Sequence, residues 1–332
     1  MQYVKFGNAG IEVSRLCLGC MDFPSRMDVA DAQRLLDSAL DQGVNLLDTA
    51  DGYRESEQVL GKILKGKRDG IILATKFWVN MERRVNGGGY SRVHIMQAIE
   101  GSLKRLQTDY IDIYQLHHPD ANTPVEEVLS TLDALVKQGK VRYIGVSNHY
   151  AWQMAHMLGV SALHNWEPIT SLQCRYNILD RAVENEIMPF CQRFNIATMI
   201  YSPLDSGMLT GKYQRGEEFP PHAKWTRLLR GGKRTIPEDT FDVLDKLREL
   251  ADKYEIALNQ LAIAWLLSKP CVTTAIMGGH KPEHFDTLYA TLEMQLDGED
   301  LALIDEVSAA CRYRPFHNQA IFQGAPPALN RW

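Results

Sequence analysis

The stretch that decides the fold is Val44-Asn45-Leu46-Leu47-Asp48-Thr49-Ala50-Asp51-Gly52-Tyr53-Arg54-Glu55-Ser56-Glu57. Its apolar beginning is typical of a buried strand, and that strand ends in the carboxylate of Asp48. A short turn follows, with Tyr53 five residues beyond Asp48, and Glu55 opens the next helix. Parallel α/β folds carry their chemistry at strand ends and in the loops just beyond. We therefore expect Asp48 and Tyr53 to face one shared space.

The same strand-then-helix pattern recurs along the chain. Apolar runs typical of strands lie at residues 16–19, 44–49, 71–77, 111–116, 141–146, 171–175, 197–201 and 273–277. Helical spacing of apolar residues, with helix start signals, occurs at 29–40, 55–65, 91–107, 124–138, 149–160, 183–194, 258–268 and 282–292. Eight such units predict a single α/β domain over residues 1–332, built as a (β/α)8 TIM barrel.

The remaining residues fit around this barrel. Asn8-Ala9-Gly10 predicts a turn between two short strands ahead of the barrel, an N-terminal β-hairpin. Residues 202–257 and the tail after 294 are left over, so we expect long loops at the C-terminal face. The alternative is an open, doubly wound sheet, which usually has a G-x-G-x-x-G turn after its first strand. This sequence has no such turn.

Composition and charge exclude several classes of function. The chain has 45% hydrophobic and 23% charged residues, which is ordinary for a globular protein. A net charge of −5 gives no electrostatic support for binding nucleic acid. No apolar run is long enough to span a membrane, and Met1-Gln2-Tyr3-Val4-Lys5 lacks the apolar core of a signal peptide. A cytoplasmic location is the expectation.

The six cysteines are expected to be buried free thiols. Cys17 and Cys20 have the spacing of a CxxC pair, but no second pair and no following helix accompanies them. On a strand, residues three apart point to opposite faces. A redox or metal site at this pair is the weaker interpretation.

Polar side chains at three neighbouring strand ends suggest the chemistry. Asp48 ends one strand, Lys76 lies near the end of the next, and His117 directly follows the one after. A buried lysine needs a partner, and Asp48 is the obvious one. A protonated lysine beside Tyr53 should lower the pKa of the phenol from about 10 towards neutral. Tyr53 could then donate a proton to a forming alkoxide while neutral His117 orients a carbonyl.

These residues lie in motifs that resemble the aldo-keto reductase family almost from end to end. The motifs are Asp48-Thr49-Ala50-x-x-Tyr53-x-x-x-Glu57, Ala74-Thr75-Lys76, Asp109-Tyr110-Ile111-Asp112-Ile113-Tyr114-Gln115-Leu116-His117, Gly139-Lys140-Val141-Arg142, Ile144-Gly145-Val146-Ser147-Asn148, Tyr201-Ser202-Pro203-Leu204 and Gly211-Lys212-Tyr213. The chain is most similar to bacterial reductases of the aryl-alcohol-dehydrogenase type. The resemblance implies a catalytic tetrad of Asp48, Tyr53, Lys76 and His117, with Tyr53 as the general acid. It also implies a small carbonyl substrate and a nicotinamide cofactor, usually NADPH, bound without a Rossmann motif.

The resemblance also assigns residues to the cofactor. Ser147, Asn148 and Gln173 would hydrogen-bond the nicotinamide carboxamide, and Tyr201 would stack on the nicotinamide ring. The pyrophosphate would be held by Ser202, Leu204, Gly207 and Lys212. Polar groups at strand ends, an aromatic ring and a cation after a glycine turn suit those roles.

The adenosine end departs from the family pattern. Gly278, His280, Lys281 and His284 match a helix opening that would receive the 2′-phosphate. The family often has Arg or Gln where His284 stands, and Glu-Asn where this chain has Thr287-Leu288. The cations Lys281, Lys212 and Arg227 favour NADPH, because an NAD site often places a carboxylate near the ribose.

Alternatives remain for the kind of site, for the class of protein, for the basic segment 222–235 and for the position of Trp78. His117-His118 with Asp120 would suit a metal-dependent hydrolase, but the other strand ends offer Lys76, Ser147 and Tyr201 rather than further ligands. We therefore expect no metal. A non-catalytic dinucleotide-binding subunit that senses redox state could keep the same residues. The basic segment 222–235 is either a solvated loop or a lid over the cofactor phosphates. Trp78 could form an aromatic wall of the substrate pocket.

Overall fold

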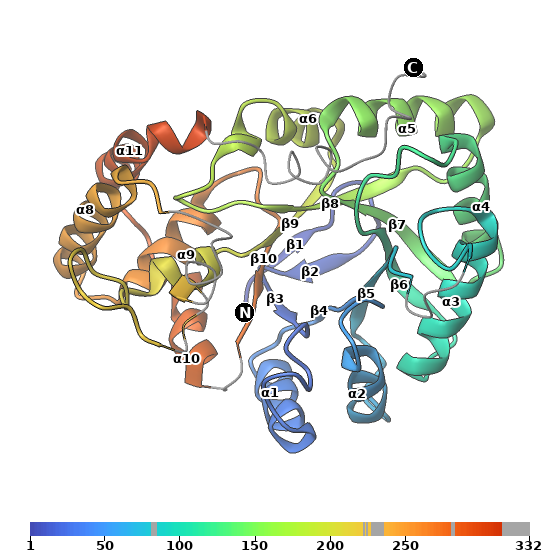
Figure 1. Cartoon of the computed structure of the whole chain (residues 1–332), viewed down its shortest axis with the longest axis horizontal. Helices are drawn as coiled ribbons and strands as arrows, with labels where there is room; N and C mark the ends of the chain where they lie inside the picture. The colour runs from blue at the N-terminus through green and yellow to red at the C-terminus, as the bar shows by residue number, and fades with distance from the viewer. Residues whose placement is uncertain (81–84, 222, 224, 227–235, 280–282, 314–332) are drawn as a thin grey trace.

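A closed barrel of eight parallel strands forms the centre of the molecule (Figure 1). The computed structural model describes residues 1–80, 85–221, 223, 225–226, 236–279 and 283–313. The barrel strands are β3 (Leu16–Gly19), β4 (Leu46–Asp48), β5 (Ile72–Phe77), β6 (Ile111–Leu116), β7 (Val141–Ser147), β8 (Ile169–Arg175), β9 (Ala197–Tyr201) and β10 (Thr274–Met277). They pair in chain order, and β10 closes the barrel against β3. The predicted (β/α)8 barrel and all eight of its strands are confirmed.

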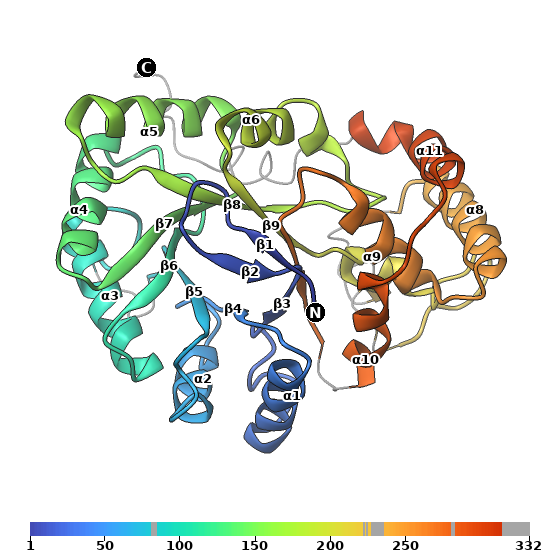
Figure 2. The same cartoon turned by 180° about the vertical axis from the view of Figure 1, so that it is seen from behind.

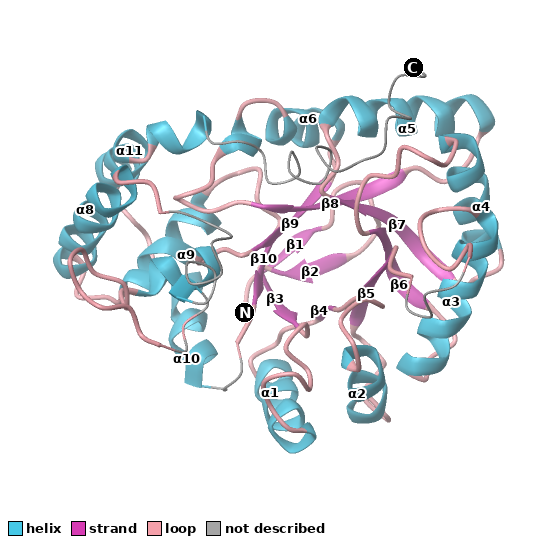
Figure 3. Ribbon diagram, in the orientation of Figure 1, coloured by secondary structure: helices cyan, strands magenta, loops and turns pink. Residues whose placement is uncertain are grey.

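Helices surround the strands (Figure 3). They are α1 (Val29–Asp41), α2 (Ser56–Ile63), α3 (Arg92–Leu106), α4 (Val125–Lys137), α5 (Ala151–His164), α6 (Ile187–Phe194), α8 (Asp239–Lys253), α9 (Leu258–Ser268), α10 (Glu283–Tyr289) and α11 (Gly298–Val307). Short 3₁₀ turns are η1 (Ala182–Glu184), η2 (Asp205–Thr210), η3 (Ala290–Leu292) and η4 (Ala309–Tyr313). No helix in the described ranges combines the length and apolarity needed to cross a bilayer.

The strands are apolar on both faces because each face is buried against a different core. One core fills the barrel and includes Cys17, Leu46, Ala74 and Ile113. The other lies between the strands and the helices, where residues such as Leu36 of α1 pack. Alternation along each strand therefore decides which residues point into the barrel. Near the carboxyl end these inward positions become polar, and the site lies there.

A hairpin closes the amino end of the barrel (Figure 2). Its strands, β1 (Tyr3–Lys5) and β2 (Glu12–Ser14), pair antiparallel as predicted. Phe6 and Val13 of this hairpin are fully buried in the same core as the barrel interior. The hairpin thus covers that end of the barrel.

Several helical predictions need correction. The helices α8 and α11 were not predicted, although they lie in the segments left over outside the barrel units. The helix expected at 183–194 is split, because Glu186 adopts φ −146° and separates η1 from α6. The helix expected at 282–292 is the seven-residue α10 followed by η3, with residue 282 outside the described residues.

The cysteines have the predicted burial with one exception. Cys17, Cys20, Cys174, Cys191 and Cys311 are buried free thiols, whereas Cys271 is partly exposed. Burial raises the pKa of Cys17, and the nearby Asp48 carboxylate raises it further. A protonated, buried thiol has little nucleophilic reactivity.

Candidate active site at the carboxyl end of the barrel

Lys76 and Asp48 form a buried ion pair between neighbouring strands. The Nζ of Lys76 lies 2.7 Å from Oδ1 and 2.8 Å from Oδ2 of Asp48, and it donates to the carbonyl oxygen of Thr49 at 2.7 Å. Lys76 is 0% exposed. Burial alone would lower the pKa of this lysine, but Asp48 outweighs that effect and the pKa is raised. Lys76 is therefore protonated at neutral pH, and the predicted pairing is confirmed.

Two glutamines hold Asp48 from the far side of the barrel interior. The Nε2 groups of Gln115 and Gln173 donate to Oδ2 of Asp48 at 3.2 and 2.8 Å. The sequence analysis gave Gln115 no role. Gln115 lies two residues before His117, so both side chains point to the same, inward face along the line of β6. Gln173 was predicted to contact the nicotinamide carboxamide, which stays a prediction, and its amide nitrogen donates to Asp48. Asp48 is thus fixed by three donors.

Tyr53 lies above Lys76 in the loop that follows β4. The Nζ of Lys76 is 5.0 Å from the centroid of the Tyr53 ring. The loop is held by the Asp51 backbone N–H, which donates to the Lys76 carbonyl oxygen at 2.9 Å, and by the Tyr53 N–H, which donates to Ala50 at 3.1 Å. Tyr53 and Lys76 therefore come together as the sequence predicted.

The expected direction of the Tyr53 pKa was wrong. Desolvation by burial raises the pKa of the phenol above its usual 10, and the charge of Lys76 lowers it without overcoming that increase. Asp48 and Asp51 add to the increase. Tyr53 is consequently a protonated phenol at neutral pH.

The ring of His117 contacts the ring of Tyr53. Their ring centroids are 5.7 Å apart, and the rings meet edge to face at 82°. Burial, the charge of Lys76 and the neighbouring His118 lower the pKa of His117 to about 2. The Nδ1 atom of His117 is buried, with no hydrogen-bond partner among the described residues. His117 is neutral, as predicted, so one ring nitrogen can donate a hydrogen bond to a carbonyl oxygen.

An aromatic wall adjoins His117. The His118 ring stacks on the His117 ring with centroids 4.6 Å apart and planes 4° from parallel. Trp78 meets His118 edge-on at 5.1 Å, and its side chain is half-buried. This arrangement agrees with the predicted use of Trp78 as a wall next to the reacting groups.

The predicted nicotinamide residues lie beside this cluster. The Nδ2 of Asn148 donates to the His117 carbonyl oxygen at 3.1 Å and to Oγ of Ser147 at 2.9 Å. The hydroxyl of Tyr201 donates to Oδ1 of Asn148 at 2.8 Å. Asn148 adopts φ +64°, a left-handed conformation that asparagine tolerates better than most residues. These contacts link the Tyr201 ring to the peptide that carries His117.

The predicted pyrophosphate residues form a compact loop after β9. The Leu204 carbonyl oxygen accepts from the Gly207 N–H at 2.9 Å and from Leu209 at 3.3 Å. A Cβ on Gly207, where φ is +95°, would lie 2.8 Å from the Nζ of Lys212, so a side chain there would displace the lysine. Burial lowers the pKa of Lys212, and the charge of Arg26 lowers it further.

Arg26 was missed by sequence reasoning. It lies between β3 and α1, yet its charge acts on Lys212, nearly two hundred positions away in the chain. The charge of Arg26 is therefore near enough to Lys212 to disfavour its protonated form. Nothing in the sequence around Arg26 signals this, because the relation exists only after the barrel closes.

The predicted adenosine end is described only in part. His280, Lys281, Arg227 and most of the basic segment 222–235 lie outside the described residues. Gly278 and His284 are exposed. At the departure from the family pattern, the Thr287 carbonyl oxygen accepts from Nε2 of Gln260 at 2.9 Å, and Leu288 packs in the core.

Asp51 is a further titratable group that sequence reasoning did not single out. Its side chain is 3% exposed, and its Oδ1 has no hydrogen-bond partner among the described residues. Burial, followed by the charge of Glu57, raises its pKa to about 7, although the N–H groups of Trp78 and Gly52 bond to the carboxylate. Through its hydrogen bond from the Trp78 N–H, Asp51 connects the Tyr53 loop to the residue that follows β5.

Comparisons with known proteins agree with this geometry. Residues 15–309 match the model of the Aldo/keto reductase family. The chain is 34% identical over 313 residues to the aldo-keto reductase YhdN of Bacillus subtilis, covering 90% of this chain and 91% of that protein. It is 30% identical over 336 residues to the versiconal hemiacetal acetate reductase of Aspergillus parasiticus, covering 92% and 96%.

A third relative carries a different kind of name. The Oryza sativa subsp. japonica protein called "Probable voltage-gated potassium channel subunit beta" is 35% identical over 292 residues, covering 85% of this chain and 88% of that protein. The family match covers most of the chain, and the barrel with Asp48, Lys76, Tyr53 and His117 at its carboxyl end accords with it. The chain belongs to the Aldo/keto reductase family.

Proposed function

We propose that this oxidoreductase reduces an aldehyde or ketone to an alcohol with NADPH, with Tyr53 as the general acid. The observation that carries the proposal is the position of Tyr53, whose ring lies within contact range of both charged, buried Lys76 and neutral His117. Bound NADPH would supply the hydride that reaches the carbonyl carbon. The phenol proton of Tyr53 would move to the carbonyl oxygen as the alkoxide forms.

Each neighbour of Tyr53 has a distinct part in this proposal. The positive charge of Lys76, held by Asp48, stabilises the phenolate left when Tyr53 gives up its proton. Neutral His117 donates a hydrogen bond that orients the carbonyl oxygen. Because its pKa is raised, Tyr53 stays protonated at neutral pH and is ready to act as an acid. Lys76 offsets part of the cost of ionising it.

The residues present fit a dinucleotide. Ser147, Asn148 and Tyr201 offer hydrogen-bonding groups and an aromatic face near His117. Gly207 leaves room for Lys212 at the adjoining loop, where a pyrophosphate would meet a cation. We propose NADPH over NADH because the sequence places His280 and Lys281 at the helix opening that would receive the 2′-phosphate, and because the family generally uses NADPH. We expect the enzyme to act in the cytoplasm on a small carbonyl compound.

The second candidate is a non-catalytic subunit that binds a dinucleotide and reports redox state to a partner. Its support is the similarity to proteins named as potassium channel β subunits. Such a subunit could keep the tetrad residues, so their presence does not decide between the two candidates.

Turnover separates the two candidates. The purified protein is mixed with NADPH and a panel of aldehydes and ketones, with aromatic members included because of Trp78 and His118. Cofactor absorbance then reports oxidation. We expect steady NADPH oxidation that depends on the carbonyl compound. Tight NADPH binding without turnover on any member of the panel would favour the subunit instead.

A further inference from the structure

Arg175 connects two loops at the cofactor end of the barrel. It is the last residue of β8, and its side chain is 8% exposed. Its Nε lies 2.7 Å from Oδ2 of Asp180, in the loop after β8, and its Nη2 forms an ion pair with Asp205, in the loop after β9. One guanidinium therefore bridges two carboxylates from different loops.

The loop that Arg175 reaches has an unusual backbone. Ser202, Asp205 and Ser206 have φ values of +53°, +45° and +57°, and Gly207 follows at +95°. Only glycine adopts this left-handed region without a steric cost. Three neighbouring residues with side chains stay there only if surrounding contacts compensate.

The described contacts that compensate are few. The Nδ2 of Asn177 donates to the Ser202 carbonyl oxygen at 2.9 Å. The indole Nε1 of Trp225 donates to the Asp205 carbonyl oxygen at 2.8 Å. The Arg175–Asp205 pair is the charged contact among them, and it holds the loop through a side chain.

The same loop presents the groups assigned to the cofactor pyrophosphate. Leu204 and Gly207 form its turn, and the Lys212 ammonium lies next to the space above Gly207. Arg175 itself is unsuited to bind phosphate, because it is buried and its charge is balanced by Asp180 and Asp205. Its charge also offsets one of the two negative charges of Asp180 and Asp205, which reduces their repulsion of an anion nearby.

We propose that Arg175 is a positioning residue that holds the 202–207 loop in the conformation that receives the dinucleotide pyrophosphate. The inference rests on the proposed function, since that function requires the dinucleotide. The inference goes beyond the proposed function because it assigns part of the cofactor affinity to an ion pair that does not contact the cofactor.

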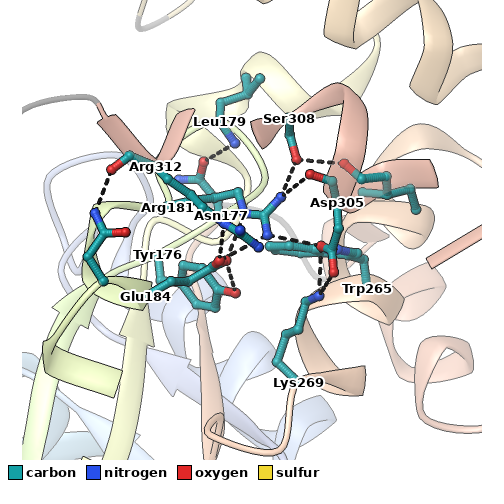
Figure 4. A network of polar contacts seen from close by, with 12 residues as sticks. Tyr176, Asn177, Leu179, Arg181, Glu184, Trp265, Lys269, Asp305, Ser308 and Arg312 are labelled. Carbon is teal, nitrogen blue, oxygen red and sulfur yellow. Dashed lines mark hydrogen bonds and ion pairs between the residues drawn. The ribbon is translucent and has the colours of Figure 1, made fainter. Parts of the chain in front are cut away.

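A second buried arginine provides a matched control (Figure 4). Arg181 is 0% exposed and lies six residues further along the chain. Its Nε and Nη2 bond to the Glu184 carboxylate at 2.7 and 2.9 Å, and its Nη1 bonds to Oγ of Ser308 at 2.6 Å. These partners tie the β8–α6 connection to the C-terminal helices, and none of them lies in the 202–207 loop. Losing Arg181 should therefore cost stability without loosening that loop.

The test compares Arg175→Met, Asp205→Asn, their double variant and Arg181→Met. We expect Arg175→Met to weaken NADPH binding, measured by fluorescence quenching, by about tenfold or more. The kcat at saturating NADPH should change much less. The double variant should bind about as weakly as Arg175→Met alone, because Arg175→Met has already removed the ion pair that Asp205→Asn would break. Arg181→Met should lower the melting temperature with little change in NADPH affinity.

A second readout does not depend on the cofactor. The indole N–H of Trp225 is buried against the Asp205 carbonyl oxygen, so its hydrogen exchange reports the order of the loop. In the protein without cofactor, exchange should be slow in the wild type and in Arg181→Met, and faster in Arg175→Met. If Arg175→Met does not fold, Arg175→Lys and Asp205→Asn carry the same comparison with smaller effects.

The outcomes separate the inference from the proposed function. Normal NADPH binding by the wild type, with unchanged indole exchange and unchanged affinity in the Arg175 variants, overturns the inference alone. Equal loss of affinity in Arg181→Met and Arg175→Met also overturns it, because the effect would then follow general stability. A wild type that fails to bind NADPH overturns the proposed function, and the inference with it.

Discussion

Lys76 contacts both carboxylate oxygens of Asp48, at 2.7 and 2.8 Å, and no solvent reaches its side chain. Two residues from adjacent strands thus bury opposite charges at the centre of the site. Burying charges is costly, and the pair persists because Gln115, Gln173 and the Thr49 carbonyl oxygen satisfy its remaining hydrogen bonds. In this account the pair keeps a positive charge beneath Tyr53.

Replacing the lysine tests that charge. Lys76→Met leaves Asp48 buried without a cation, so the free energy of unfolding should fall by about 3–5 kcal/mol. Because Lys76 lowers the pKa of Tyr53, its loss should raise the apparent pKa of the acid in the pH–rate profile and slow reduction. Arg68→Met is the control, since Arg68 pairs with the buried Asp112 near the start of β6. A similar stability loss with an unchanged pH–rate profile is expected there.

Replacing the carboxylate is less direct. Asp48→Asn keeps the shape of the side chain but removes the charge that holds Lys76 in place. We expect slower reduction and a shifted pH–rate profile, with Asp112→Asn as the control that loses a buried carboxylate elsewhere. Profiles that match the wild type in both Lys76→Met and Asp48→Asn would refute the role of the pair.

His117 should remain neutral over the working range. Burial, Lys76 and His118 lower its pKa from 6.5 to about 2, so the folded protein does not take up the proton that the unfolded chain binds below pH 6.5. Stability attributable to His117 is therefore present above that pH and decreases as pH falls from 6.5 towards 2. In an NMR titration, the His117 ring signals should stay constant from about pH 8 to about pH 5. A midpoint near 6.5 would show that the ring charges.

Asp51 should have the opposite effect on stability. Its pKa is raised from 3.8 to about 7, so between those values the folded protein holds a proton that the unfolded chain has lost. Its contribution to the free energy of unfolding should decrease with rising pH by about 1.4 kcal/mol per pH unit in that window. Asp51→Asn should remove this slope. Denaturant melts at several pH values measure it, and parallel curves for wild type and variant would contradict the assignment.

Cofactor choice is open to a paired test. Lys281→Ala should weaken NADPH more than NADH, because only NADPH carries a 2′-phosphate for that end of the site. Lys212→Met is the matched control, and it should weaken both cofactors about equally, because both have a pyrophosphate. Fluorescence quenching gives the dissociation constants, and the NADPH preference should shrink as salt increases. Equal affinities for the two cofactors in the wild type would refute the preference.

The sequence predicted the barrel because its strands carry their own signal. A run such as Ile111–Leu116 is buried on both sides, so it is rich in apolar residues and stands out from its surroundings. The helix α8 was missed although Leu244, Leu247 and Leu250 have helical spacing, because it lies outside the repeating units. In α11 only Asp300 and Ile304 are buried, so its pattern is weak.

The site residues were predictable where a sequence motif contains them. The pKa of a side chain was less predictable where its burial in the folded protein determines that pKa. Asp48, Tyr53, Lys76 and His117 come together as their positions at strand ends imply. The sequence showed that a lysine would neighbour Tyr53, but not that burial would raise the pKa of the phenol by more than Lys76 lowers it. The predicted direction of the Tyr53 pKa was therefore wrong. Arg26 and Gln115 gain their importance from residues in other segments of the folded chain, and Asp51 gains it from burial, none of which local sequence reports.

The central claim is that Tyr53 gives the proton during carbonyl reduction, and one comparison tests it directly. NADPH oxidation by wild type and Tyr53→Phe is followed with the same aldehyde, together with NADPH affinity from fluorescence quenching. We expect Tyr53→Phe to reduce the aldehyde roughly 10²- to 10⁴-fold more slowly while binding NADPH about as well as the wild type. Wild-type turnover in Tyr53→Phe, with cofactor binding intact, would contradict the account.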